Sequence, residues 1–319
     1  MRTLFYGTPA LAVPFLDLLA RKSEVVGVLT NPDKPVGRSL RVQPTPVKAC
    51  ALELGLPVFQ PERPAALAGE LSALRPDLAV AVAYGKILPK EILAVPALGS
   101  LNVHFSLLPK YRGAAPVQWS LLRGENRTGV TIFWLEPELD TGPVFLRQET
   151  EIGPEEDAAS LFSRLGALGL QALETSLDEV AAGRIRKAPQ SGEPSFAPRL
   201  RREDARIALS RPARQIHDQV RGLRLWPTAY LELVPPAPRQ VRVLSTALPS
   251  SSEGAAGGGQ AAAGRIIRVE RGGGILVECG GSSSLWILTV QPEGKKTLAA
   301  ADFLNGLRLG PGSDLPLAL

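Results

Sequence analysis

The sequence predicts an α/β domain with a parallel sheet, followed by a smaller domain that contains an antiparallel β-barrel. Up to about residue 183, short apolar runs alternate with helical patterns, which is typical of a parallel sheet covered by helices on both faces. Beyond about residue 212, short β-rich runs follow one another with turn residues between them. A length of 319 residues with 45% apolar content is sufficient for two such cores.

Five short apolar runs are predicted as strands of the first domain: residues 4–6, 25–29, 78–83, 101–104 and 130–134. Helical patterns lie between them, for example at residues 10–21 and 47–54. The best-marked helix is predicted to begin at Pro154 and to stop at Gly183. Acidic residues fill its first turn, and glycine is a common helix stop.

The turn after the first strand, Gly7-Thr8-Pro9, stands where a dinucleotide-binding sheet carries its glycine-rich phosphate loop. Only one glycine is present, and Pro9 lacks the backbone N–H that a phosphate would need. The sequence therefore favours a Rossmann-like domain that does not bind a dinucleotide.

The first domain is predicted to cover residues 1–189, and a stretch rich in proline, serine and charge predicts a linker at residues 190–204. The second domain, residues 205–319, is expected to begin with a short helix at 212–223. Its predicted strands are residues 229–233, 240–244, 265–269, 275–279 and 285–290. A Ser/Gly/Ala tract at residues 250–264 is predicted to be a flexible loop with no assigned role.

The net charge of +5 is unevenly distributed. Residues 1–200 contain 21 basic and 21 acidic side chains, whereas residues 201–319 contain 15 basic and 10 acidic ones. A basic bias in one domain fits contact with nucleic acid, and it equally fits a solvated surface. Charge alone does not decide between these interpretations.

The two cysteines, Cys50 and Cys279, are far apart and form no CxxC pair, so the sequence supports neither a disulfide framework nor a metal site. Arg2-Thr3 followed by a strand does not resemble a signal peptide. No apolar run reaches the roughly 18 residues that a membrane span needs. We therefore expect a cytoplasmic protein without membrane contact.

One of the two histidines lies where a predicted strand meets a loop, in the run from Ser100 to Pro116. Asn102 and His104 are two residues apart, so on a strand their side chains share one face. An amide that donates hydrogen bonds beside an imidazole that takes protons suits acyl transfer. The alternative is a histidine held by backbone partners at a strand end.

The residues around this pair resemble the signature of the 10-formyltetrahydrofolate-dependent formyltransferase family, which reads Asn-x-His, Ser-Leu-Leu-Pro and Arg-Gly-Ala-Ala-Pro. The segment 135–142, Leu-Glu-Pro-Glu-Leu-Asp-Thr-Gly, resembles the second signature of the family. Further similar segments occur at residues 5–14, 30–38, 82–89, 205–207, 226–227, 291–296 and 302–306, so the resemblance covers nearly the whole chain. Two segments depart from the pattern: residues 39–41 lack the usual glycine and lysine pair, and Arg224-Leu225 replaces Asn-Pro before Trp226-Pro227.

Formyl transfer to an amine passes through a tetrahedral carbon with a developing oxyanion. Asn102 is expected to donate to this oxyanion and His104 to take the proton of the attacking amine. The resemblance adds Asp140, which is expected to hold the imidazole tautomer, to stabilise its cation and to influence proton movement to the folate nitrogen. Asp-Thr-Gly is also ordinary turn chemistry, which is the alternative for Asp140.

The resemblance implies 10-formyltetrahydrofolate as co-substrate and no metal. The positions that match the folate-contacting residues of the family are Ser106, Leu107, Leu108, Pro109, Tyr84, Gly85, Ile87, Leu88 and Leu139. Plain core packing is the competing interpretation for the apolar and glycine positions.

The resemblance is greatest to the branch of the family whose acceptor is the amino group of methionine on initiator tRNA. It implies that the C-terminal domain is an OB-like, tRNA-binding barrel, and we expect a monomer. The loop at residues 31–42 is long and polar, so it is either a solvated loop or an RNA contact. Candidate tRNA-binding residues are Lys34, Arg38, Arg41, Lys295 and Lys296.

Other functions remain possible from the sequence. A formyltransferase acting on a small-molecule amine would use the same chemistry, although the extra basic domain disfavours it. A non-catalytic tRNA-binding protein is disfavoured because Asn102, His104 and Asp140 are all present. Hydrolysis of the formyl donor without transfer is a further alternative.

Overall fold

A computed structural model describes residues 1–36, 41–235, 237–250 and 263–318. The predicted tRNA contact Arg38 and most of the predicted 250–264 loop therefore lie outside the described residues. The chain divides into two compact units. The first contains Met1–Pro116, Arg127–Glu151 and Ser163–Pro198, and the second contains Val117–Asn126, Ile152–Phe162 and Arg199–Leu319.

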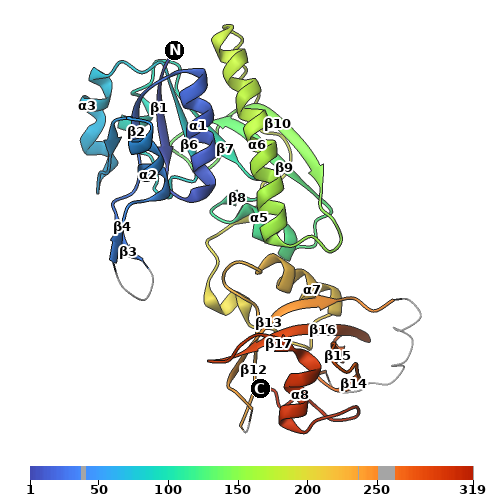
Figure 1. Cartoon of the computed structure of the whole chain (residues 1–319). Coiled ribbons are helices and arrows are strands. Elements are labelled where there is room, and N and C mark those ends of the chain that lie inside the picture. Colours follow the sequence, from blue (N-terminus) through green and yellow to red (C-terminus); the bar gives the residue numbers. More distant parts are fainter. Residues whose placement is uncertain (37–40, 236, 251–262, 319) are drawn as a thin grey trace. The chain divides into compact units, whose positions relative to one another are not determined.

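The first unit contains a seven-stranded sheet in the order β10-β9-β7-β6-β1-β2-β5 (Figure 1). Its strands are β1 Arg2–Gly7, β2 Glu24–Leu29, β5 Val58–Phe59, β6 Leu78–Val82, β7 Ser100–His104, β9 Arg127–Trp134 and β10 Val144–Glu151. The five strands from β5 to β7 are parallel to their neighbours, but β9 pairs antiparallel with both β7 and β10. The predicted parallel sheet is therefore confirmed for five strands, whereas β9 and β10 at one edge run antiparallel to their neighbours. The connection between β9 and β10 is too short for the crossover that a parallel pair requires.

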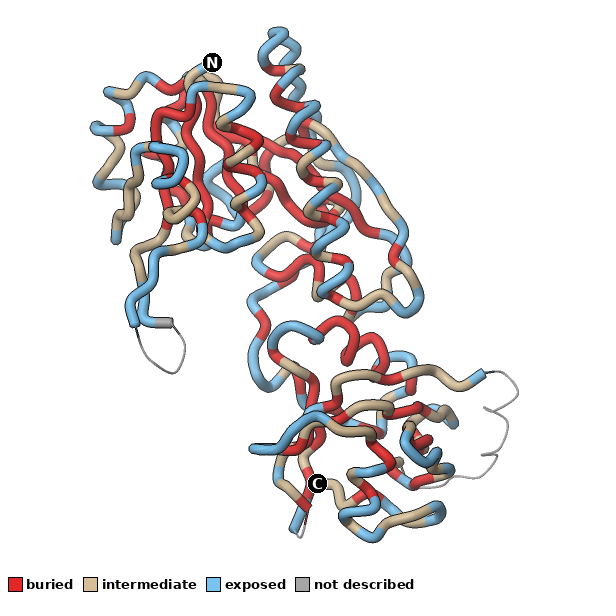
Figure 2. The backbone as a smooth tube through the Cα atoms, in the orientation of Figure 1, coloured by how far each residue is buried: buried red, intermediate tan, exposed pale blue. Residues whose placement is uncertain are grey.

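Burial of apolar side chains explains why the central strands form this sheet. Leu4, Phe5 and Tyr6 of β1 are fully buried, and Figure 2 shows the strands of this unit as a buried layer. This unit contains the helices α1 Val13–Lys22, α2 Pro46–Glu53, α3 Ala68–Ala73 and α4 Lys90–Leu93, the 3₁₀ turns η1 Ala10–Ala12 and η2 Pro64–Leu67, and most of the long helix α6 Ala158–Ala181. A small hairpin is formed by β3 Lys34–Val36 and β4 Arg41–Gln43.

The long helix α6, Ala158–Ala181, begins four residues after the predicted Pro154. The Asp157 carboxylate accepts a hydrogen bond from the Ser160 backbone N–H at 2.9 Å, so Asp157 acts as the N-cap. The Glu156 carboxylate accepts from the Gly153 N–H at 3.0 Å and closes a turn ahead of the helix. Asp157 therefore caps the helix from the position before its first residue, whereas Glu156 binds the turn that precedes it.

The segment after α6 contacts the first unit closely, although its composition predicts a linker. Ala188 exchanges two backbone hydrogen bonds with Val144, of 2.7 and 3.0 Å. Strand β11, Phe196–Ala197, pairs parallel with β8, Arg112–Gly113. The division into units changes at Pro198 and Arg199, inside the predicted 190–204 linker. The linker itself stays a prediction.

The second unit contains an antiparallel sheet in the order β12-β13-β16-β15-β14, with β17 paired to β16. Its strands are β12 Tyr230–Glu232, β13 Gln240–Ala247, β14 Ile266–Val269, β15 Ile275–Cys279, β16 Ser283–Pro292 and β17 Leu298–Ala299. The second unit also contains the helices α5 Pro116–Leu122, α7 Ala213–Gly222 and α8 Ala300–Leu307, and the 3₁₀ turn η3 Arg202–Ala205. All five predicted strands are present, whereas α8 and β17 were not predicted. Closure of this sheet into a barrel stays a prediction.

A buried polar cluster ties α7 to the turn before α6. Asp218 and Arg221 form an ion pair of 2.7 Å with both side chains 5% exposed. Arg221 also donates to the carbonyls of Gly153 and Glu156, at 3.2 and 3.0 Å. The second histidine, His217, lies in this cluster, where burial lowers its pKa and Thr246 Oγ1 lies 3.0 Å from its Nδ1. His217 is therefore buried among polar side chains, which indicates a structural role.

In the described part of the chain, every helix is too short or too polar to cross a membrane.

Candidate active site

Asn102 and His104 lie on β7, in the middle of the larger sheet. Asn102 stands between Ala81 of β6 and Phe133 of β9, and His104 is opposite Thr131 of β9. Because the two residues are separated by one position on a strand, their side chains project from the same face. His104 is 5% exposed and Asn102 is half-buried.

The orientation of the His104 ring is determined by its backbone neighbour Tyr111. His104 Nε2 lies 2.9 Å from the Tyr111 carbonyl oxygen. A carbonyl can only accept, so Nε2 carries the hydrogen and the lone pair of neutral imidazole lies on Nδ1. The Phe133 ring meets the imidazole edge-on, with centroids 6.2 Å apart and an interplanar angle of 88°. The nitrogen that is able to take a proton is therefore Nδ1.

Asp140 faces that nitrogen. Its Oδ2 lies 3.7 Å from His104 Nδ1, and the carboxylate is 9% exposed. The same oxygen accepts a hydrogen bond from the Gly113 N–H at 2.7 Å. We expected Asp140 to hold the imidazole tautomer, but the Tyr111 carbonyl does so, because Asp140 lies beside the nitrogen that carries the lone pair. The other expected role of Asp140, to stabilise the protonated ring, is compatible with this position and stays a prediction.

The backbone conformation around Asp140 restricts which residues fit there. Asp140 has φ of +54°, in the left-handed region that aspartate tolerates better than most side chains. At Gly142 an added Cβ would lie 1.8 Å from the Trp134 carbonyl oxygen, so only glycine fits. The Asp-Thr-Gly sequence is thus a turn, as the alternative interpretation holds, and this turn directs its carboxylate at the imidazole.

The Asn102 amide is available to a substrate. Across the described residues 1–36, 41–235, 237–250 and 263–318, its side chain has no hydrogen-bond partner. A half-buried amide with free N–H groups beside a base is suited to stabilise negative charge on a reacting oxygen.

The segment after His104, predicted to contact folate, is tightly braced. Thr131 Oγ1 donates to the Ser106 carbonyl at 2.7 Å and accepts from the Leu108 N–H at 3.1 Å. The Ser106 hydroxyl donates to the Lys110 carbonyl at 2.6 Å. Ser106, Leu108 and Pro109 are buried, and Leu107 is half-buried. These contacts hold the backbone at the end of β7 in one conformation.

The second predicted folate segment divides into buried and exposed residues. The Tyr84 ring is buried beside Tyr6, with centroids 6.2 Å apart, and burial raises the pKa of Tyr84 to about 12. Its carbonyl already accepts from Thr8 Oγ1 and Asn31 Nδ2, each at 2.9 Å. Leu88 is also buried, whereas the remaining predicted positions Gly85, Ile87 and Leu139 are exposed.

The predicted tRNA contacts lie on two different units. Lys34 and Arg41 are exposed on the β3–β4 hairpin, on either side of the undescribed residues 37–40. The base of this hairpin is anchored by Asp33, which pairs with Lys48 at 2.5 Å and accepts from Gln60, two hydrogen bonds that lower its pKa. Lys295 and Lys296 are exposed in the turn between β16 and β17.

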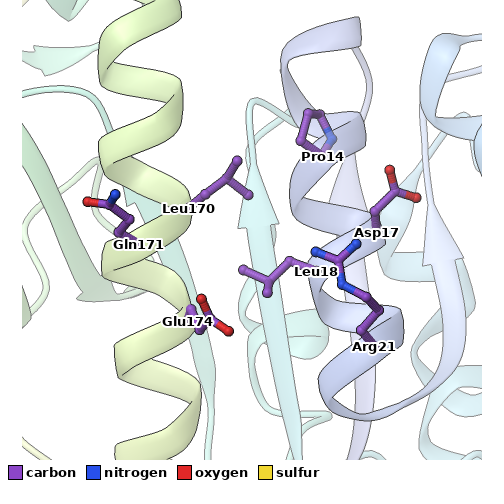
Figure 3. Close-up of a pocket in the computed structure, with 7 residues that line it drawn as sticks. All are labelled: Pro14, Asp17, Leu18, Arg21, Leu170, Gln171 and Glu174. Carbon is purple, nitrogen blue, oxygen red and sulfur yellow. The ribbon is translucent and has the colours of Figure 1, made fainter.

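A cavity of about 210 Å³ lies elsewhere in the first unit, between α1 and α6 (Figure 3). Its lining contains none of the predicted site residues: Pro14, Asp17, Leu18, Arg21, Leu170, Gln171 and Glu174. Two of its acidic groups already have partners, because Glu174 pairs with Lys22 at 2.9 Å and Asp17 accepts from the Cys50 thiol at 3.3 Å. This cavity is separate from the His104 centre.

Within the described residues, no group of three or more His, Cys, Asp or Glu side chains is arranged to hold a metal. The arrangement around His104 is suited to proton transfer by an imidazole, with a carboxylate beside it and an amide nearby.

Sequence reasoning missed the groups that position this centre. The Tyr111 carbonyl and the Gly113 N–H are backbone atoms, and the sequence around them does not indicate that they contact His104 and Asp140. Gln190 donates to the carbonyls of Asp140 and Gly142, at 2.8 and 2.9 Å, from within the predicted linker. A glutamine in such a polar stretch has no local signature that would distinguish it.

Two family models match the chain. "Formyl transferase" matches residues 3–177, and "Formyl transferase, C-terminal domain" matches residues 199–308. A methionyl-tRNA formyltransferase of Sorangium cellulosum (strain So ce56) is 41% identical over 317 residues, covering 98% of this chain and 98% of the relative. A methionyl-tRNA formyltransferase of Citrifermentans bemidjiense is 43% identical over 317 residues, covering 98% and 95%.

Solved structures share the fold at much lower identity. An N-formyltransferase from Helicobacter canadensis, in complex with folinic acid and dTDP-3-aminofucose, has a TM-score of 0.66 at 16% identity, covering 90% of this chain and 98% of that chain. HypX from Aquifex aeolicus, in complex with tetrahydrofolic acid, has a TM-score of 0.63 at 17% identity, covering 98% and 48%. These two comparisons support the fold.

Proposed function

This chain belongs to the methionyl-tRNA formyltransferases of the formyl transferase family, and we propose that Asn102, His104 and Asp140 carry out its reaction with 10-formyltetrahydrofolate as donor. The reaction moves a formyl group to the amino group of methionine on initiator tRNA. The observation that carries the assignment of roles is the His104 ring, whose Nε2 is bound to Tyr111 while Nδ1 faces Asp140 at 3.7 Å.

The first chemical step forms the new bond. The methionine amine attacks the formyl carbon of the donor, and the carbonyl oxygen becomes an oxyanion that the Asn102 amide stabilises by donation. The attacking nitrogen becomes cationic and passes a proton to Nδ1 of His104. The Asp140 carboxylate beside Nδ1 stabilises the imidazolium that results.

The second step breaks the old bond. The bond between the formyl carbon and the folate nitrogen N10 cleaves, and the bonding electrons stay on that nitrogen. The imidazolium donates its proton to N10, so His104 is neutral again and the proton taken from the amine has moved to the folate nitrogen. A protein nucleophile is not needed, because the substrate amine attacks directly. The exposed positions Gly85, Ile87 and Leu139 are proposed to contact the folate.

The alternative function differs from the proposed one in its acceptor, which would be a small-molecule amine. Sugar N-formyltransferases share the fold at 16–18% identity, whereas tRNA-directed relatives match the full chain at about 40%. We expect the protein, supplied with 10-formyltetrahydrofolate, to formylate methionyl-tRNA and to leave an amino-sugar nucleotide unmodified. Comparable kcat/KM values for the two acceptors would contradict the proposal and favour the small-amine alternative.

The second unit is proposed to form an OB-like barrel that contributes electrostatic affinity for tRNA, because the excess positive charge of the chain lies in residues 201–319. We further propose that the reaction takes place in the cytoplasm and that the enzyme acts as a monomer.

The first prediction concerns Arg38, which lies between β3 and β4 in the sequence. Arg38→Ala is expected to raise the KM for methionyl-tRNA several-fold and to leave the affinity for 10-formyltetrahydrofolate unchanged, because the hairpin is proposed to contact RNA alone. Arg127→Ala is a matched control, since Arg127 is an exposed arginine of the same unit whose surface ion pair with Glu149 contributes little. A fall in folate affinity for Arg38→Ala would place this hairpin at the folate pocket.

The second prediction concerns Lys295 and Lys296. The logarithm of the affinity of the intact protein for tRNA is expected to fall linearly with the logarithm of the salt concentration, because phosphate contacts release counterions. The double alanine variant should reduce the magnitude of that slope by about 1 for each lysine that contacts a phosphate. Filter binding between low and physiological salt measures it. An unchanged slope would remove these lysines from the interface.

A further inference from the structure

Gln190 is a half-buried glutamine whose side-chain amide makes four polar contacts. Its Nε2 donates to the carbonyls of Asp140 and Gly142, at 2.8 and 2.9 Å. Its Oε1 accepts from Arg112 Nη2 at 2.6 Å and from Arg112 Nε at 3.3 Å. Both amide hydrogens and the amide oxygen are therefore engaged, all of them with two segments of the same centre.

These contacts join the two segments that present the Asp140 carboxylate. Gln190 holds the backbone of the 140–142 turn on one side and the Arg112 side chain on the other. The residue after Arg112 is Gly113, whose N–H binds Asp140 Oδ2 at 2.7 Å. Asp140 has φ of +54°, a conformation that persists only when its surroundings hold it. Gln190 supplies two of the bonds that do so.

The same segment also supports the group that orients His104. The Ser195 hydroxyl oxygen accepts from the Tyr111 N–H at 3.0 Å, and the Ser195 carbonyl accepts from the Arg112 N–H at 2.8 Å. At Gly113 a Cβ would lie 2.6 Å from the Ala197 carbonyl oxygen, so this segment lies directly against β8. Both neighbours of the imidazole thus rest on residues that follow α6.

We infer that Gln190 is a positioning residue for formyl transfer, which holds the Asp140 carboxylate at His104 and does not itself touch substrate. The inference rests on the proposed roles of His104 and Asp140. If Gln190 only stabilised the fold, its replacement would lower activity by the same factor whether or not the Asp140 carboxylate is present. A positioning residue acts through Asp140, so its effect must disappear when the Asp140 carboxylate is removed.

The test is a double-mutant cycle on the full-length protein, with Gln190→Ala and Asp140→Asn made separately and together. We expect Gln190→Ala to lower kcat about 10-fold or more, because small misplacement of a catalytic group is costly. The KM values for tRNA and folate should change little. In the Asp140→Asn background the same substitution should have no further effect on kcat. Gln171→Ala, an exposed glutamine on α6 without these contacts, is the control.

Gln190→Glu keeps the side-chain volume and the contact with Arg112 but lacks both amide donors, so it tests the same idea if the alanine variant does not fold. We expect its kcat to fall as that of Gln190→Ala does. Equal fold-losses in both backgrounds, or an unchanged kcat in a folded variant, would overturn the inference. An Asp140→Asn variant with full activity would instead contradict the proposed function, so the two failures are distinguishable.

Discussion

Replacement of His104 by alanine is expected to lower the single-turnover rate of formyl transfer by about 10²- to 10⁴-fold, the usual contribution of a general base. The Tyr111 carbonyl binds Nε2 and leaves the lone pair of Nδ1 available, so the substitution removes the group proposed to take the proton of the attacking amine. Binding of methionyl-tRNA and of folate should change little. Rapid-quench measurement at saturating enzyme separates the chemical step from binding.

The chain offers a control for this experiment in its other histidine. His217→Asn keeps a polar atom near Thr246 and lies outside the catalytic centre, so its single-turnover rate should equal that of the unaltered protein. A loss of tenfold or less for His104→Ala, in a folded variant that still binds both substrates, would show that His104 is not the base.

Replacement of Asn102 by alanine is expected to lower kcat by about 10²- to 10³-fold, the range seen when one oxyanion donor is lost. The amide is half-buried on the same face of β7 as His104 and has no partner among the described residues. Asn102→Asp has nearly the same shape but lacks the N–H groups, so we expect a loss at least as large. Steady-state kinetics on both variants measures it. An effect confined to KM would instead make Asn102 a substrate-binding group.

The strands of both units were predictable where they are apolar. β1, β2, β6 and β7 are buried over almost their whole length, and their predicted bounds lie within two residues of the observed ones. β10 was not predicted, because after Val144 and Phe145 every second residue faces solvent and the apolar signal is lost. An edge strand of this kind has no continuous hydrophobic run.

The helix of residues 158–181 shows how far a boundary can be predicted from local signals. Proline and acidic residues predicted a start at Pro154, whereas Asp157 is the cap and the residues before it bind back onto α7 through Arg221. That contact joins residues 68 positions apart, and no local pattern contains it.

The residues proposed to be catalytic could be recognised in the sequence because their types and spacing carry chemistry, whereas the groups that support them could not. Asn102 and His104 share a strand face by spacing alone, whereas Asp140 required the resemblance. Gln190 lies 50 residues from Asp140 and 78 from Arg112, in a stretch whose composition predicts a linker. The orientation of His104 depends on the backbone carbonyl of Tyr111, whose side-chain type gives no sign of this contact.

Direct transfer of the formyl group to the amine of charged tRNA is the central step of the proposed reaction. The most direct measurement follows a labelled formyl group from 10-formyltetrahydrofolate after mixing with the protein and methionyl-tRNA. We expect the label on the amino nitrogen of methionine on initiator tRNA, with tetrahydrofolate formed in equal amount. Release of the label as free formate, with methionyl-tRNA unmodified, would contradict the account.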